Sequence, residues 1–289
     1  MNPGIKYYEL RLEKMTMTCT NSYFIMTVDV DPPFTSKQNY IIYKGIDQLL
    51  NLFSKYSIRA TFFVPAIVAK EFSEVVKKIV ELKHEIGCHG LKHDPMETIL
   101  SINKQVRNIK KATEIIEFAT GVRPIGFRAP LFKINRDCFI ALQKNGYLYD
   151  SSIVNSLFYA RSTIAWRSKP FCIKNFAGED HPLIEIPVSV NPLLPFPIGG
   201  GWLRIFGLKW AKIGLKMNLT LRKQAMFYIH PKDLISLSGH NLPWYYYRNV
   251  PNCIKMLTEV IKYVQQNGAL SITASELASN VFKNFLFKK

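Results

Sequence analysis

Strand-like and helix-like segments alternate along most of this chain, and this alternation limits the fold more than any other feature. Alternation of this kind is typical of parallel βαβ units, in which each helix crosses back over the sheet. The predicted strands are 23–29, 58–64, 84–88, 124–127, 184–188, 226–230 and 269–272, and the predicted helices are 40–56, 71–83, 98–119, 134–145 and 250–266. We therefore predict an α/β fold, a distorted or incomplete (β/α)7-type barrel.

The domain organisation follows from length and composition. The chain has 289 residues, 48% of them hydrophobic, which is enough for one large α/β domain. No linker divides it, so we predict a single domain over residues 22–289 after an N-terminal extension, 1–21. Residues 151–225 break the alternation and are rich in proline and aromatic residues, and we interpret them as an insertion that carries binding.

An acidic pair, Asp29 and Asp31, ends the first predicted strand, directly after the apolar run 24–28. Two carboxylates separated by one residue in an extended segment point to the same side. The C-terminal ends of parallel strands are where barrels place their chemistry, so we expect a site here. The alternative is a turn-forming acidic pair ahead of Pro32 and Pro33.

Two histidines four residues apart, His89 and His93, follow the predicted strand 84–88 and should lie on the same rim as the aspartates. Imidazoles at this spacing can present both rings to one divalent cation, with a carboxylate as third ligand. The other carboxylate would be free to act as a base. A cation that lowers the pKa of water beside such a base is suited to hydrolysis.

Two further polar residues end later predicted strands. Arg128 follows 124–127, and an arginine there can orient a carboxylate through a bidentate pair. His230 ends 226–230, where a histidine can serve as general acid for a departing amine. The pattern as a whole favours cleavage of an amide bond.

These motifs resemble, in order, those of the polysaccharide deacetylase family, which is also described as the NodB homology domain or carbohydrate esterase family 4. The matching segments are Thr27–Asp31, His89–His93, Arg128–Pro130, Tyr149–Ser152 and Tyr228–His230, within about residues 23–275. Val30 separates the two aspartates, a spacing that resembles the intracellular and lipid-precursor branches of that family. The fourth motif lacks its usual tryptophan, and Tyr228 replaces a leucine, so we expect a different pocket wall.

The resemblance implies a metal-dependent N-deacetylase on a distorted barrel. In that family's terms, Asp29 is the catalytic base, His230 the general acid, Arg128 positions Asp29, and Asp150 belongs to the supporting network. The implied metal ligands are Asp31, His89 and His93, with Zn²⁺ as the expected ion and Co²⁺, Ni²⁺ or Fe²⁺ as alternatives. The residues expected to line the substrate pocket are Pro130, Tyr228, Gly200 and Trp202.

The net charge, the N-terminal residues and the cysteines predict the binding partners and the location of the protein. A formal net charge of +17 favours anionic neighbours, although a lysine-rich proteome would also give it. The cations are scattered and match no nucleic-acid motif, so we predict no nucleic-acid partner. The first 21 residues do not resemble a signal peptide and the cysteines show no pairing pattern, which together predict a cytoplasmic protein.

One predicted helix, 202–217, is amphipathic and basic. Its apolar face would carry Trp202, Phe206, Trp210, Ile213 and Met217. Such a helix can lie in an anionic membrane interface, but it can equally pack on the domain. The glycine-rich segment 195–202 also resembles deacetylases of surface-glycan assembly. We therefore hypothesise a sugar substrate linked to a polyprenyl phosphate at the inner face of the cell membrane.

Other functions stay open from the sequence. An N-deformylase or an amidase acting on a related substrate would use the same residues. A catalytically silent glycan- or membrane-binding protein could keep the fold, although the expected ligands are all present. An iron-dependent oxygenase would also use two histidines and one carboxylate, but such sites usually lie in a β-sandwich.

Overall fold

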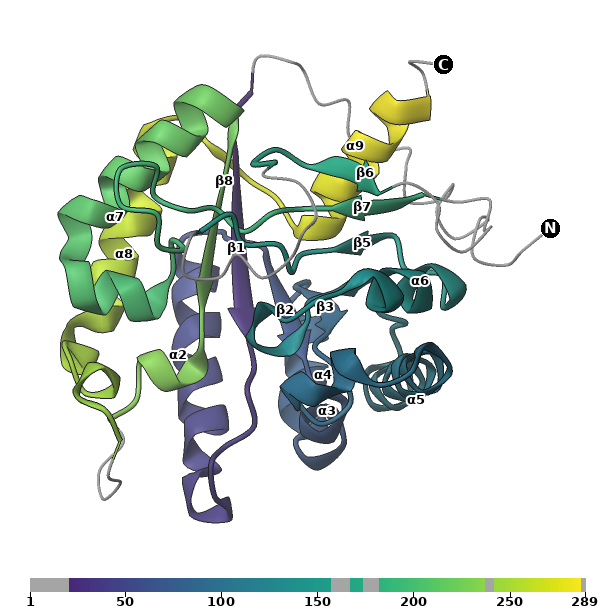
Figure 1. Cartoon of the computed structure of the whole chain (residues 1–289). Coiled ribbons are helices and arrows are strands. Elements are labelled where there is room, and N and C mark those ends of the chain that lie inside the picture. Colours follow the sequence, from purple (N-terminus) through teal and green to yellow (C-terminus); the bar gives the residue numbers. More distant parts are fainter. Residues whose placement is uncertain (1–20, 157–166, 174–181, 237–241, 287–289) are drawn as a thin grey trace.

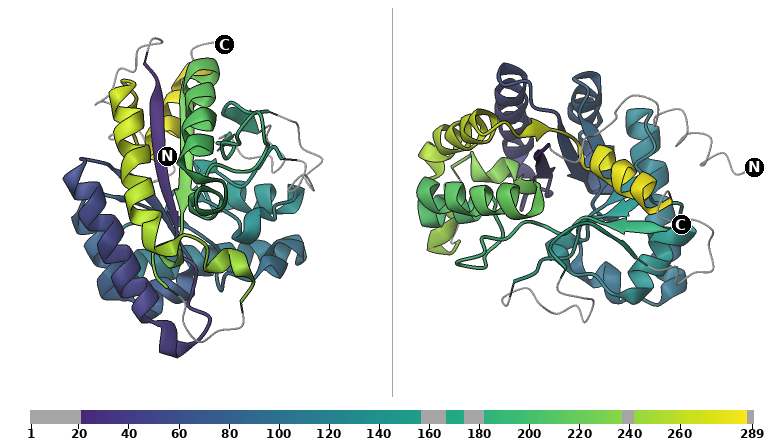
Figure 2. Two further views of the ribbon diagram at one scale, coloured as in Figure 1. Left: turned by 90° about the vertical axis from the view of Figure 1, so that its left-hand side faces the viewer. Right: turned by 90° about the horizontal axis from the view of Figure 1, so that it is seen from above.

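The computed structural model describes residues 21–156, 167–173, 182–236 and 242–286. They form one strongly curved sheet with helices around its outside (Figures 1 and 2). The strand order is β6–β7–β5–β4–β3–β2–β1–β8, and β9 pairs with β1. The pairings are parallel except β6–β7. The predicted α/β fold of the distorted-barrel class is confirmed.

The strand bounds agree with the predictions at most positions. The strands are β1 (Tyr23–Asp29), β2 (Ala60–Val64), β3 (Glu85–Cys88), β4 (Gly126–Phe127), β5 (Tyr149–Asp150), β6 (Phe171–Ile173), β7 (Leu183–Glu185), β8 (Gln224–Ile229) and β9 (Leu270–Ser271). Neither β5 nor β6 was predicted. Both have only two or three residues, which is too short for a strand to show a period in its sequence.

The helices cover the outer face of the sheet, except for the last, which packs with the inner cluster. They are α2 (Tyr40–Lys55), α3 (Ala66–Glu71), α4 (Ser73–Glu81), α5 (Ile102–Thr120), α6 (Arg136–Lys144), α7 (Gly200–Arg222), α8 (Val250–Gln266) and α9 (Ala274–Leu286). The predicted helix 71–83 corresponds to α4. The helix α3, which ends at Glu71, was not predicted, and Phe72 separates the two. The helix α9 was not predicted.

The first strand divides the core into two parts because its side chains alternate between the two faces of the sheet. Phe24, Met26 and Val28 pack outward in the large cluster shared with the helices. Tyr23 and Ile25 pack inward, in a smaller cluster inside the curve. Asp29 continues the inward set, so the fold delivers its carboxylate to the interior of the barrel.

The sheet does not close with regular strands between β7 and β8. Isolated bridges in the segment 188–199 span this gap and end with Gly199 beside Tyr228 of β8. A methyl group on Gly199 would lie 2.2 Å from the Tyr228 ring, so only glycine fits there. This segment belongs to the predicted insertion 151–225, and here it completes the wall of the barrel.

The amphipathic prediction for 202–217 falls on α7, which is kinked at Gly207. Its buried face carries Leu203, Ala211, Leu215 and Leu219, and packs on the domain. Trp202, Phe206 and Trp210 are half-buried and stack in series, with ring centroids 5.6 and 5.1 Å apart. Within the described residues, no helix combines the length and apolar character needed to cross a bilayer.

Candidate active site

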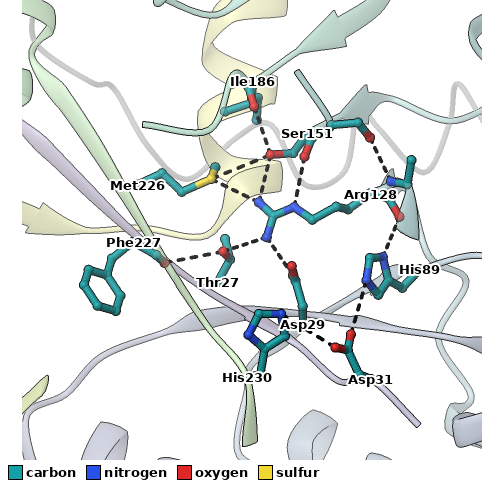
Figure 3. Close-up of polar contacts among 12 residues, drawn as sticks. Thr27, Asp29, Asp31, His89, Arg128, Ser151, Ile186, Met226, Phe227 and His230 are labelled. Atoms are coloured by element: carbon teal, nitrogen blue, oxygen red, sulfur yellow. Dashed lines mark hydrogen bonds and ion pairs between the residues drawn. The ribbon is translucent and has the colours of Figure 1, made fainter. Parts of the chain in front are cut away.

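The site lies at the C-terminal ends of β1, β3, β4 and β8, where the predicted polar residues come together (Figure 3). Arg128, after β4, is completely buried and donates through Nη1 to Asp29 Oδ1 at 2.7 Å. The same nitrogen donates to Thr27, which precedes Asp29 by two residues on the inner face of β1. The structure thus places Arg128 against Asp29, through a single Nη1–Oδ1 bond rather than a bidentate pair.

The other guanidinium donors of Arg128 are also satisfied. Nε and Nη2 donate to the backbone oxygen and the hydroxyl of Ser151, each at 2.9 Å, and Nη2 also lies 3.1 Å from the Met226 sulfur. The guanidinium lies 4.2 Å from the Phe63 ring centroid. All five N–H groups of an arginine therefore have acceptors, which fixes the position of Asp29.

Asp150, on β5, supports the hydrogen-bond network around Arg128. Its carboxylate accepts from the backbone and hydroxyl of Ser152, and that hydroxyl accepts from the backbone N–H of Ala129. Asp150 pairs in register with Glu185 on β7. Burial of the two neighbouring carboxyls raises the pKa of Asp150, and it raises that of Glu185 further. Sequence reasoning missed Glu185, which carries no motif.

Asp31, His89 and His93 form the cluster of described residues suited to a metal ion. Nε2 of His93 lies 2.9 Å from Asp31 Oδ1, and Nε2 of His89 lies 3.7 Å from it. Nδ1 of His89 contacts the Arg128 carbonyl oxygen at 2.7 Å, and only a protonated nitrogen can donate there. With Nδ1 bound in this way, Nε2 is the His89 nitrogen that faces the Asp31 carboxylate, so a bound cation fits this set.

The loop between the two histidines is held by Glu97. Its carboxylate accepts from the backbone N–H groups of Leu91 and Lys92, at 2.8 and 2.7 Å. Gly90 and His93 both have positive φ angles, +83° and +64°. The loop is therefore a tight turn, which presents both histidines on one side.

His230 lies across the site from the two histidines. Its Nδ1 and its backbone N–H both face Asp233 Oδ2, at 3.2 and 3.0 Å. Burial alone would lower the pKa of His230, but the carboxylates of Asp31 and Asp233 raise it above its usual value. The cationic form is thus favoured, as a general acid requires.

Asp233 is held in turn by α7. Arg204 donates through Nη2 to Asp233 Oδ1 at 2.8 Å. A methyl group on Gly200 would lie 2.5 Å from Asp233 Oδ2, so glycine lets this carboxylate approach the N-terminus of α7. Sequence reasoning missed Asp233 and Arg204. The pattern His-Pro-Lys-Asp over 230–233 is a local signal that could have identified Asp233.

A lysine that sequence reasoning also missed contacts the same centre. Nζ of Lys232 lies 2.5 Å from Asp31 Oδ2, on the opposite carboxylate oxygen from the two histidines. Although burial opposes the charged form, Lys232 and His230 keep the pKa of Asp31 well below its usual range. Asp31 therefore stays ionised, as a metal ligand must.

The four residues expected to line the substrate pocket differ in exposure. Pro130 is buried against Gly90, and Gly200 is buried against Asp233. The Tyr228 ring is nearly buried and packs edge-on to Phe132 and His230. Trp202 is half-buried, with its ring 4.3 Å from that of Phe196. Contact of any of the four with a substrate stays a prediction.

The sequence is similar to known proteins over both halves of the chain. The polysaccharide deacetylase family model matches residues 21–149, and a domain of unknown function, DUF3473, matches 151–266. A peptidoglycan deacetylase of Helicobacter pylori is 33% identical over 156 residues, which make up 50% of this chain. Those residues cover 53% of the Helicobacter protein, about half of its length.

Solved structures share the fold. A provisionally named polysaccharide deacetylase from Mycobacterium smegmatis superposes with a TM-score of 0.67 and 19% identity, over 93% of each chain. A protein of Bacillus anthracis described as a carbohydrate esterase family 4 pseudoenzyme superposes with a TM-score of 0.56 and 15% identity, over 90% of this chain and 66% of its own. At such identities these likenesses establish the fold alone.

Proposed function

We propose that this chain, whose residues 21–149 match the polysaccharide deacetylase family model, is a metal-dependent hydrolase that removes the N-acetyl group from an amino sugar. The observation that carries this proposal is the separation of the two aspartates of β1. Among the described residues, the Asp29 carboxylate is bound by Arg128, whereas Asp31 faces two histidines. One carboxylate is thereby kept as a base and the other as a ligand.

Asp31, His89 and His93 would hold the metal, with Zn²⁺ expected first and Co²⁺, Ni²⁺ or Fe²⁺ as alternatives. A divalent ion there would polarise the acetyl carbonyl and lower the pKa of water. The turn held by Glu97 sets the positions of both histidines. The hydrogen bond from Nδ1 of His89 to the Arg128 carbonyl leaves Nε2 free for the ion.

Asp29 would take the proton from the attacking water. Its Oδ1 is occupied by Arg128, which fixes the carboxylate on the inner face of β1 and leaves Oδ2 for the proton. His230 would then protonate the departing amine of the sugar. The Asp233 carboxylate at Nδ1 orients the imidazole, so that Nε2 faces Asp31 and the centre.

The substrate would be an N-acetylated sugar of a polysaccharide or of a lipid-linked precursor. The net charge of +17 supports an anionic lipid or phosphate nearby. The polyprenyl link, the contact of 202–217 with an anionic membrane, and the cytoplasmic location are proposals that rest on the sequence. The N-terminal extension 1–21 lies, except for its last residue, outside the described part of the chain.

The test is release of amine from N-acetylglucosamine oligomers by zinc-loaded protein. The variants Asp29→Asn and His89→Ala should both abolish release, and only His89→Ala should lose bound zinc. Asp47→Asn, on the exposed surface of α2, is the matched control. If the protein binds zinc but releases amine from no acetylated sugar, the amidase or the deformylase would be favoured. Failure to bind zinc would favour a silent binding protein.

A further inference from the structure

An exposed group of aromatic side chains lies beside the candidate active site. It consists of Phe34, after β1, and four consecutive residues after β8, Trp244–Tyr247, which we call together the aromatic platform. Trp244 is 64% exposed, and Phe34, Tyr245 and Tyr247 are also exposed. Exposed aromatic rings gathered in one place mark binding surfaces more often than single ones do.

The rings of the platform contact one another in sequence. The centroids are 6.2 Å apart for Phe34 and Tyr246, 4.9 Å for Tyr246 and Tyr245, and 6.1 Å for Tyr245 and Trp244. The Arg248 guanidinium lies 5.8 Å from the Trp244 ring. These four rings therefore form one contiguous group, in which the Phe34–Tyr246 and Tyr245–Trp244 contacts are edge-to-face.

The inner end of the platform borders residues of the candidate active site. Phe34 lines a small pocket together with Asp31, His230 and Lys232. The ammonium of Lys232, which binds Asp31, lies 5.8 Å from the Phe34 ring. Phe34 therefore connects the residues around Asp31 to the other rings of the platform.

The platform is also fixed to the catalytic machinery. Nη1 of Arg204 donates to the carbonyl oxygens of Tyr245, Tyr246 and Arg248, at 3.0 to 3.1 Å. Nη2 of the same arginine binds Asp233, the partner of His230. One buried guanidinium therefore sets the backbone of the platform and the orientation of the proposed acid, so the platform is organised before any ligand arrives.

We propose that the aromatic platform binds the sugar rings next to the one that is deacetylated, so that the preferred substrate is an oligomeric glycan. This inference rests on the proposed function and narrows its substrate. The apolar faces of pyranose rings stack on aromatic rings, while tyrosine hydroxyls and Arg248 can bond to sugar hydroxyls. Continuity with the pocket favours a glycan over a bilayer, which would need no alignment with Asp31.

The first test compares N-acetylglucosamine oligomers of increasing length with zinc-loaded protein. For wild type, kcat/KM should rise from the dimer to the hexamer. Trp244→Ala should lower kcat/KM for the hexamer by about 10-fold through KM, and should lower it less for the dimer. Trp244→Phe should restore most of the loss. Phe118→Ala removes a 93% exposed ring on α5 and should leave kcat/KM unchanged for both the dimer and the hexamer.

The second test does not depend on turnover. Titration calorimetry of the hexamer into Asp29→Asn protein, with and without Trp244→Ala, measures the platform even if the protein acts on another acyl group. Equal affinity of the two proteins for the hexamer would overturn the proposal. Loss of binding to phosphatidylglycerol vesicles with unchanged hexamer affinity would instead identify the platform as a membrane contact.

Discussion

Two arginine–carboxylate pairs flank the candidate site, and they are built for different tasks. On the base side, Arg128 binds Asp29 directly, and neither side chain is appreciably exposed. On the acid side, Arg204 binds Asp233, and Asp233 contacts His230, whose side chain is 21% exposed. The comparison suggests that a proton acceptor can be held rigidly inside the barrel, whereas the donor must stay open to the departing group.

The largest expected effect tests the base side. Asp29→Asn should lower kcat/KM by about 10²- to 10⁴-fold, because an amide cannot accept the proton of the attacking water. Zinc stoichiometry should stay unchanged, since Asp29 does not face the histidines. Steady-state kinetics with a metal analysis of the same sample would check both. Comparable activity in the variant would remove the distinction between the two sides.

Replacing each arginine in turn by methionine compares the two pairs directly. Arg128→Met should lower the free energy of unfolding by about 3–5 kcal/mol, because Asp29 is left buried without its cation. Arg204→Met should cost less, since the N-terminus of α7 still faces Asp233. Urea unfolding of both variants measures the difference. A larger loss for Arg204→Met would reverse our ranking of the two sides.

Asp233→Asn tests whether the acid side works through orientation and charge. We expect kcat to fall by about 10- to 100-fold with little change in zinc affinity. Because the Asp233 carboxylate raises the pKa of His230, its removal should lower that pKa. The basic limb of the pH–rate profile would then move to lower pH. An unshifted limb would mean that His230 is not the acid.

The motifs of the base side could be predicted from sequence because each one ends a strand with a clear apolar run. Asp29, His89 and Arg128 are therefore found by reading the chain locally. The acid side was only partly predicted. Arg204 lies on α7, and nothing local in its sequence shows that it points at Asp233 rather than at solvent. Pairings of this kind depend on how helices pack, which a single sequence does not display.

The same limit applies to the shorter elements of the fold. The strands β5 and β6 are defined by their neighbours in the sheet and not by a pattern of their own. The aromatic platform was likewise invisible as a group, because Phe34 and Tyr246 are far apart in the chain and meet only in the folded state.

Two adjacent glycines give a sharper test of the acid side. Gly200→Ala should destabilise the protein by about 1–3 kcal/mol, because the new methyl group would lie 2.5 Å from Asp233. Gly201→Ala is the matched control, since its nearest atom of Asp233 is 4.0 Å away. A helical alanine there should be neutral or stabilising by about 0.5–1 kcal/mol. Thermal unfolding would separate them.

The smallest expected effect concerns the carboxyls behind the base side. Burial raises the pKa of Glu185, so the folded protein holds a proton that the unfolded chain releases. This contribution to stability is complete below the unfolded pKa of about 4.3 and is lost as pH rises through the folded value. In the wild type, the melting temperature should therefore fall as pH rises through this range. Glu185→Gln should make that fall smaller. An unchanged pH dependence would show that Glu185 is ionised in the folded state.

The pairing of β1 with β8 has a consequence for the timing of folding. Thr27 bonds to Phe227, 200 residues further along the chain. A ribosome that adds roughly 5–20 residues per second would release the two partners about 10–40 s apart. Asp31, His89 and His93 are all synthesised in the first third of the chain. The nascent polypeptide would therefore complete its set of metal ligands well before the proton donor exists, and metal capture would precede catalytic competence.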